Sequence, residues 1–158
     1  MPNGNNIALA LRAAYLALHR RSDAQFSLHG ITADQFVLLA TLARGHALTQ
    51  RELARRMSSD PSTVRAMLVL LERSGLVKRD SHPVDGRART VALTANGKRT
   101  FRQLWAAGEP IREEMLDAIQ PGDAETLVRL LTQVAEALNA ETAQVGNPIH
   151  THSPEDEP

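Results

Sequence analysis

The Asp60-Pro61 pair constrains the fold of this chain more than any other feature, because it separates two helical segments. Pro61 lacks a backbone N–H and its ring clashes with the preceding turn inside a helix, but it fits the first helical turn. Asp60 carries a side chain that caps a helix N-terminus. We therefore predict a helix over residues 61–73, which ends before Gly75 and follows a short helix over residues 50–57.

These two segments are close enough to form a helix-turn-helix. Thr49 and Glu52 have the spacing of a capping box at the start of the first helix. Ala54 is small, as a close crossing of two helices requires. The apolar positions of both helices supply a shared core: Leu53, Met57, Val64, Leu68 and Leu71. An ordinary helical hairpin has the same pattern, so the spacing alone leaves both interpretations open.

The second helix has the surface expected of a recognition helix. Its early polar residues Ser62, Thr63 and Arg65 face away from the apolar stripe. In DNA-binding helix-turn-helix proteins, these positions meet base edges in the major groove. The helix N-terminus also offers unpaired N–H groups to a phosphate.

A β-hairpin is predicted directly after this helix. Residues 76–79 and 89–93 alternate between apolar and polar side chains, and a turn-rich stretch joins them. Arg87 and Arg89 in this hairpin suit the narrow, electronegative minor groove of DNA. Asp85 is placed to orient the guanidinium of Arg87 by a charge-assisted bond. A solvated charged loop is the alternative interpretation of the same residues.

The rest of the chain is predicted to be helical apart from its end. The fold class is therefore mainly α, a winged helix-turn-helix with a small β-hairpin wing and a helical region from both termini. The helix over 7–28 carries two apolar stripes, which indicates burial on two sides. Residues 144–158 are polar and acidic and are predicted to form a disordered tail. The other predicted helices span 32–43, 94–119 and 123–143.

Charge is distributed unevenly along a chain whose formal net charge is zero. Residues 44–102 carry thirteen Arg and Lys side chains against five acidic ones, whereas residues 103–158 carry two against eleven. A basic block of this kind is what polyanions such as nucleic acids select. A chance cluster of solvated charges is the plainer alternative.

Several function classes are disfavoured by composition. The sequence has no Cys, which excludes disulfides, Cys-ligated zinc and a thiol nucleophile. Neither His82 nor the pair His150 and His152 has the spacing of a metal site on a helix, so we predict no metal and no cofactor. The neighbours Ser81, His82 and Asp85 do not suggest a hydrolase, because one loop does not align a triad and no oxyanion hole is indicated. The chain is not predicted to be an enzyme.

The expected compartment is the cytoplasm. The N-terminus has neither a basic segment nor an apolar one, so we predict no signal peptide. No window of 18 apolar residues exists, so no membrane interaction is expected.

Five short runs carry a resemblance to a known protein family. They are Leu48-Thr49-Gln50-Arg51-Glu52-Leu53-Ala54, Asp60-Pro61-Ser62-Thr63-Val64-Arg65, Leu71-Glu72-Arg73-Ser74-Gly75-Leu76-Val77-Lys78-Arg79, Asp85-Gly86-Arg87 and Leu93-Thr94-Ala95-Asn96-Gly97. With these runs the sequence resembles the MarR family of winged-helix transcription regulators. The resemblance covers residues 7–142 and implies one domain over 1–143. Within that domain the winged helix would span 32–98, helices 7–28 and 123–143 would form a homodimer, and helix 94–119 would link them.

The resemblance also implies binding to double-stranded DNA at a pseudo-palindromic operator. Family contacts to bases match Pro61, Ser62 and Arg65, and the minor-groove contact matches Arg87. Pro61 occupies a position that is often Lys or Gln in relatives. Together with the reasoning from the residues, the predicted DNA-binding set is Thr49, Pro61, Ser62, Thr63, Arg65, Asp85, Arg87 and Arg89.

Family members are most often repressors that release DNA when a small ligand, frequently an aromatic acid or phenol, enters a cleft beside the dimerisation helices. A small aromatic anion would need a cation for its carboxylate and flat apolar walls. The residues that fit are His19, Arg20, Phe26, His29, Trp105 and Arg112. Purely structural roles are the plainer alternative, with Trp105 in the core, Arg20 and Arg112 solvated and His19 at an interface. A winged-helix protein-interaction module without DNA binding is the alternative function, but it should have lost Arg65, Arg87 and Arg89.

Overall fold

The computed structural model describes residues 1–81, 84–86 and 89–145, with side-chain surroundings up to residue 140. The chain divides into two compact units, Met1–Glu113 and Glu114–Pro158, which we describe separately. The predicted extent of one domain over residues 1–143 therefore stays a prediction.

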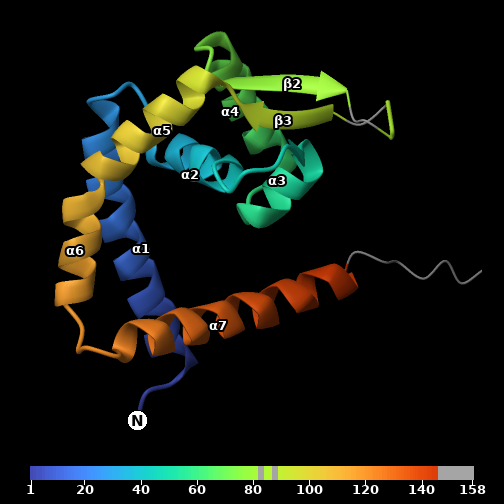
Figure 1. Cartoon of the computed structure of the whole chain (residues 1–158). Coiled ribbons are helices and arrows are strands. Elements are labelled where there is room, and N and C mark those ends of the chain that lie inside the picture. Colours follow the sequence, from blue (N-terminus) through green and yellow to red (C-terminus); the bar gives the residue numbers. More distant parts are fainter. Residues whose placement is uncertain (82–83, 87–88, 146–158) are drawn as a thin grey trace, which may run out of the picture. The chain divides into compact units, whose positions relative to one another are not determined.

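The first unit contains a helical layer and a small sheet (Figure 1). Helix α2 lies against α1, α3 and α5, and the hairpin of β2 and β3 projects from the helices. The elements are α1 (Gly4–Ser27), α2 (Ala33–Leu42), β1 (Leu48–Thr49), α3 (Gln50–Arg56), α4 (Pro61–Arg73), β2 (Val77–Ser81), β3 (Arg89–Leu93), α5 (Ala95–Ala107) and the start of α6 (Glu109–Asp117).

Local capping residues place the starts of α2, α3 and α5 where the sequence predicts them, whereas α1 begins at Gly4, three residues earlier than predicted. Thr32 and Gln35 form a complete capping box, in which each side chain accepts the other residue's backbone N–H. Thr94 caps α5 by accepting the Gly97 N–H at 2.9 Å. At α3 only half of the predicted box forms, because Thr49 accepts the Glu52 N–H while the Glu52 carboxylate turns to two arginines.

The sheet has three antiparallel strands in the order β1-β3-β2. The predicted hairpin is confirmed, and its register pairs Val77 with Leu93 and Ser81 with Arg89. The sequence analysis missed β1, which pairs Leu48 with Val91. Two residues are too short for an alternating pattern to show, so only the tertiary pairing reveals this strand.

The core of the first unit is aliphatic and lies among α2, α3, α4, α5 and the sheet. Four of the five residues assigned to the shared helix-turn-helix core are buried, and Met57 packs against them while partly exposed. Other buried residues are Leu38, Leu39, Val91 and Leu104, each with an exposed fraction of 0%. The helix-turn-helix thus shares one core with the rest of the unit.

The prediction of one helix over 94–119 is wrong. The structure has α5 and α6 instead, with the break at Gly108. Pro110 explains the break, because it has no N–H to donate to the carbonyl four residues earlier and its ring crowds that carbonyl. Pro110 is tolerated as the second residue of α6, where no intrahelical donor is needed.

Helix α1 buries little of its surface in the chain. Phe26 is its buried residue, whereas Ile7, Leu9 and Tyr15 are 49%, 60% and 58% exposed. Among the described residues, both apolar stripes that the sequence indicated are therefore largely exposed, except at Phe26.

The second unit contains the end of α6 and the long helix α7 (Asp123–Val145). Leucines of α7 lie exposed, among them Leu127, Leu131 and Leu138. Residues 144 and 145 belong to α7 rather than to a tail, and the remainder of the predicted tail lies outside the described residues. In the part of the chain that the structure describes, no helix has both the length and the apolar character to cross a membrane.

Candidate nucleic-acid interface

The turn between α3 and α4 depends on one residue with left-handed backbone. Ser58 has φ of 50°, and its N–H donates to the Arg55 carbonyl at 3.1 Å. The Ser59 N–H donates to the Ala54 carbonyl at 3.0 Å. These bonds end α3 and reverse the chain, so that α4 begins at Pro61 after a short turn.

Asp60 organises the first turn of α4. Its Oδ1 accepts the Thr63 N–H at 2.9 Å and the Ser62 hydroxyl at 2.7 Å, and its Oδ2 accepts the Thr63 hydroxyl. The hydrogen bonds from Thr63, followed by that from Ser62, hold the pKa of Asp60 well below its ordinary value. Asp60 therefore remains a carboxylate and fixes both hydroxyl groups.

This arrangement determines what the two hydroxyl groups offer to a ligand. A hydroxyl has one donor and two acceptor lone pairs. Because Asp60 takes the donor of both Ser62 and Thr63, each presents an acceptor outward. In the major groove, such an acceptor matches the amino group of cytosine or adenine.

The outward face of α4 agrees with the sequence analysis. Pro61, Ser62, Thr63 and Arg65 are exposed, while Val64 between them is 1% exposed. Arg65 forms no ion pair with any side chain that the structure describes, so its guanidinium donors face solvent. The predicted exposure of Ser62, Thr63 and Arg65 is confirmed, and their contact with DNA stays a prediction.

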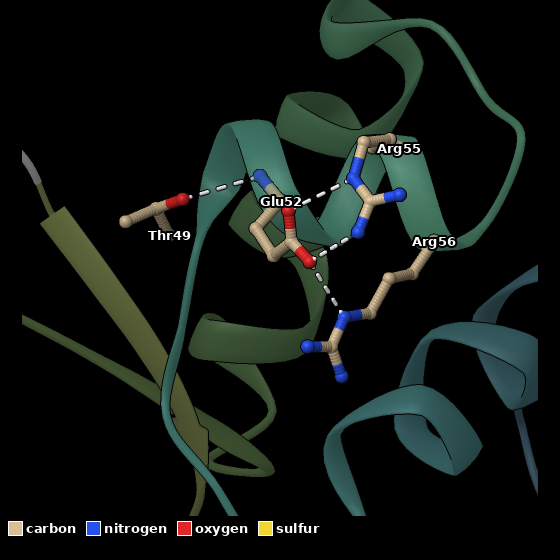
Figure 2. A network of polar contacts seen from close by, with 4 residues as sticks. All are labelled: Thr49, Glu52, Arg55 and Arg56. Atoms are coloured by element: carbon tan, nitrogen blue, oxygen red, sulfur yellow. Dashed lines mark hydrogen bonds and ion pairs between the residues drawn. The ribbon is translucent and has the colours of Figure 1, made fainter.

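The sequence analysis missed an ion-pair cluster on α3 (Figure 2). Arg55 donates to both carboxylate oxygens of Glu52, at 3.0 and 2.6 Å, and Arg56 donates to Oε1 at 2.8 Å. The hydrogen bonds from Arg55, then Arg56, lower the pKa of Glu52 to about 2. The bond to Glu52 in turn raises the pKa of Arg55. Spacings of three and four residues on a helix could have revealed this cluster.

A second unpredicted ion pair joins the wing to α4. Arg79 on β2 donates from Nε to the Glu72 carboxylate at 2.6 Å. The Arg79 side chain is only 24% exposed, so the cation of this pair is better shielded from solvent than either arginine of the α3 cluster. This contact ties the hairpin to the helix that precedes it.

The wing residues themselves are only partly described. Arg89 is exposed at the first position of β3, and Asp85 is exposed on the loop between the strands. Arg87 and His82 lie outside the described residues, as do His150 and His152. Among the residues that are described, no group of three or more His, Asp or Glu side chains has the geometry to hold a metal ion.

Three of the predicted ligand residues gather at the end of α5. The Arg112 guanidinium lies 3.9 Å from the centre of the Trp105 ring and donates to the Trp105 carbonyl and to Glu109. Phe26 also lies beside Gly108, where an added Cβ would stand 3.3 Å from Phe26 and 3.0 Å from Arg112. Phe26 is 3% exposed and stacks on Phe36, so it belongs to the core more than to an open wall.

The other three predicted ligand residues are dispersed on α1 and just beyond it. His19 lies 3.7 Å from Asp34 and 5.7 Å from the Tyr15 ring. Arg20 and His29 are exposed, and the structure does not bring them to Trp105 through any contact among its described residues. What the sequence did not show is the aromatic series that continues from Phe36 through Phe101 to Trp105, with centroids 6.0 and 5.9 Å apart.

Comparison with known proteins finds one family. Residues 31–88 match the model of the MarR family. The transcriptional regulator HosA of Escherichia coli O111:H- is 28% identical over 113 residues, which are 72% of this chain and 84% of HosA. The transcriptional repressor MdtR of Bacillus subtilis is 25% identical over 140 residues, 89% of this chain and 90% of MdtR.

Solved structures share the same fold. The apo form of MarR from E. coli superimposes with a TM-score of 0.68 at 27% identity, covering 85% of this chain and 97% of MarR. The regulator PcaV of Streptomyces coelicolor, solved with its natural ligand, gives a TM-score of 0.71 at 25% identity over 86% of this chain and 94% of PcaV. The Staphylococcus aureus MepR–DNA complex gives 0.72 at 21% identity, with 82% and 96% covered, and supports the fold alone.

Proposed function

This chain belongs to the MarR family of winged-helix transcriptional regulators, and we propose that it binds a pseudo-palindromic DNA operator as a homodimer and acts as a repressor. The family consists of regulators rather than enzymes, so the chain is not an enzyme. The proposal concerns what the regulator binds and how.

The observation that carries the proposal is the outward face of α4. Arg65 is exposed, without an ion pair among the described residues, one turn from the helix start. A free guanidinium in the major groove bonds guanine O6 and N7 together. Ser62, with its donor bound to Asp60, presents an acceptor to an amino group on a neighbouring base. One α4 thus offers two different base contacts.

The distribution of charge also supports contact of α3, α4 and the wing with DNA. The block over residues 44–102 is strongly basic, and it contains α3, α4 and the wing. Arg55 and Arg56 share the charge of Glu52, so their net contribution to a polyanion field is that of one cation. Arg65 and Arg89 have no such pairing among the described residues, and we assign them the base and backbone contacts of α4 and the wing.

Exposed apolar surface supports the homodimer. Ile7, Leu9 and Tyr15 of α1 are exposed, and in the other unit so are Leu127 and Leu138 of α7. Monomeric proteins rarely leave contiguous apolar patches of more than a few hundred Å² in water. A second copy that covers both helices would also present two α4 helices, as a pseudo-palindrome requires.

The effector that we propose is a small aromatic anion bound near Trp105. Arg112 already lies over the indole ring and donates to the Glu109 carboxylate, so its guanidinium is placed to bind a carboxylate beside an aromatic ring. An incoming carboxylate would replace Glu109 at the guanidinium. PcaV, solved with its natural ligand, is a relative of similar fold and supports a ligand-responsive role.

Selection from a random duplex library tests the function. We expect the full-length protein to enrich a two-fold consensus whose half-sites are centred about 10 base pairs apart, one turn of B-DNA. Sedimentation of the same protein should give a dimer. Enrichment of no consensus would contradict the proposal and favour a protein-interaction module.

A further inference from the structure

Asp60 places a negative charge at the start of α4. Its carboxylate accepts three donors of the first helical turn, which are the Thr63 N–H and the hydroxyls of Ser62 and Thr63. Asp60 is exposed and forms no ion pair with any side chain that the structure describes. Within this part of the chain, hydrogen bonds and the positive end of the helix dipole therefore balance its charge, rather than a cation.

This carboxylate makes the first turn of α4 a poor partner for the DNA backbone. A helix N-terminus often binds phosphate through its free N–H groups. Here the Thr63 N–H already donates to Asp60 at 2.9 Å, and a phosphate in the same place would meet a group of like charge. Phosphate oxygens only accept hydrogen bonds, and the Ser62 and Thr63 hydroxyls already donate their protons to Asp60.

The base edges of the major groove differ in the same property. Cytosine and adenine each present an amino group that donates, whereas guanine presents two acceptors and thymine presents one acceptor beside its methyl group. A hydroxyl that can only accept matches the first two bases. Against guanine or thymine it places one acceptor opposite another. The direction of a hydroxyl proton on α4 thus separates bases that fit from bases that do not.

We propose that Asp60 is a positioning residue that sets the base preference of α4. By holding the protons of Ser62 and Thr63, it makes this turn select the amino groups of cytosine or adenine and reject guanine, thymine and phosphate. Asp60 acts on DNA through the two hydroxyls rather than by its own contact with a base. This inference rests on the proposed function, because it gives Asp60 a part in reading the operator.

The two carboxylate oxygens of Asp60 have different partners, which makes the proposal testable at one hydroxyl. Oδ1 accepts the Thr63 N–H and the Ser62 hydroxyl, at 2.9 and 2.7 Å, whereas Oδ2 accepts the Thr63 hydroxyl. Asp60→Asn must keep its one oxygen on the backbone N–H, so its amide nitrogen replaces Oδ2. That nitrogen donates to the Thr63 hydroxyl and frees the hydroxyl proton. The substitution therefore reverses Thr63 and leaves Ser62 as it was.

Selection from a random duplex library with the unmodified protein and with Asp60→Asn tests the proposal. The unmodified protein should enrich cytosine or adenine at the two positions of each half-site that the hydroxyls read. Asp60→Asn should shift the Thr63 position toward guanine or thymine and keep the base at the Ser62 position. Between duplexes that differ at the Thr63 position alone, the affinity ratio should change about fivefold or more, the equivalent of one net hydrogen bond.

Two single substitutions identify these positions in the consensus. Thr63→Val replaces the hydroxyl by a methyl group of similar size, and Ser62→Ala removes the other hydroxyl. Each should abolish the preference at one position of the half-site. Adding Asp60→Asn to Thr63→Val should change the preference no further at that position, because the hydroxyl through which Asp60 acts is gone.

Asp80→Asn is the matched control for charge. Asp80 is exposed on β2, within the same basic block over residues 44–102. Removing its carboxylate should raise the affinity for every duplex by a similar factor and leave the base preference unchanged. Asn and Asp cap helices about equally well, so thermal unfolding should show that Asp60→Asn keeps the stability of the unmodified protein.

A shift at the Thr63 position alone supports the role of Asp60. A consensus that Asp60→Asn leaves unchanged, or that it changes equally at both positions, would overturn that role and leave the proposed function standing. The same conclusion would follow if Thr63→Val and Ser62→Ala weakened binding to all duplexes alike, since the hydroxyls would then contact the backbone. If the unmodified protein enriches no consensus, the proposed function is refuted and the role of Asp60 with it.

Discussion

Gly97→Ala is predicted to destabilise the protein, although alanine is the better helix former. Gly97 is the third residue of α5, and an added Cβ would stand 1.9 Å from the Leu76 carbonyl oxygen and 2.9 Å from its carbon. Real Cβ contacts stay beyond 3.0 Å, so the helix and the Leu76 backbone would have to separate by about 1 Å. That carbonyl also accepts the Thr94 N–H at 3.1 Å, so separation weakens the bond that begins α5.

The magnitude follows from two opposing terms. Overpacking costs about 1–3 kcal/mol, and a backbone neighbour that cannot rotate away places this site at the upper end. Replacing glycine by alanine inside a helix returns about 1 kcal/mol. The free energy of unfolding should therefore fall by about 2 kcal/mol, which corresponds to a Tm lower by about 4–8 °C in a protein of this size.

Thermal unfolding followed by circular dichroism measures this effect. Gly4→Ala at the start of α1 is the matched control, because nothing lies within 4 Å of its added Cβ. The control should change stability by no more than about 0.5 kcal/mol. If Gly97→Ala unfolds at the same temperature as the unmodified protein or higher, the close approach of α5 to Leu76 is refuted.

Four further substitutions test the interface and the ion-pair cluster on α3. Arg65→Ala should cost about 1–3 kcal/mol of DNA binding and relax the preference at one base of each half-site, whereas an equal loss on all sequences would make Arg65 a phosphate contact. Arg87→Ala should reduce the slope of log affinity against log salt by up to about two units, since a dimer has two wings. Asp85→Ala should weaken binding if Asp85 orients Arg87, and tighter binding with the same slope would refute that role. Glu52→Gln should lower the free energy of unfolding measured by urea titration at pH 7. Because the pKa of Glu52 is depressed from 4.5 to about 2, the stability difference between the two proteins should shrink as the pH falls through that interval. A stability difference that does not depend on pH would contradict the ion-pair cluster.

The elements that the sequence predicts well are those with local signals. Asp60 and Pro61 fix the start of α4 because a cap and a first-turn proline need no distant partner. Gly75 ends that helix with φ of 70°, a conformation in which glycine has no Cβ penalty. The exposed polar face of α4 follows from helical periodicity once those two ends are known.

The sequence predicts local structure less well where tertiary contacts or a single residue determine it. Strand β1 exists only because Leu48 and Thr49 meet β3, and no local pattern marks it. The break at Gly108 has a local signal in the sequence, because Pro110 cannot donate to a carbonyl within one continuous helix. Phe26 is predicted to line a ligand site because an aromatic residue near a basic one suits an anion; it stacks on Phe36 inside the core, and its contact with a ligand stays a prediction.

The contacts around the candidate site also divide into those that a local sequence pattern predicts and those that depend on tertiary structure. The cluster of Glu52 with Arg55 and Arg56 follows from spacing along one helix. The pair of Arg79 with Glu72 joins a strand to a helix, and no spacing rule predicts it.

The central claim is that exposed residues of α4 read a DNA sequence. Fluorescence anisotropy at one fixed salt concentration, with the selected operator and a scrambled duplex of equal length, tests it most directly. Specific complexes of this kind are at least about a thousandfold tighter than the nonspecific complexes of the same protein. We expect a ratio of that order, and equal affinity for the two duplexes would contradict base reading by α4.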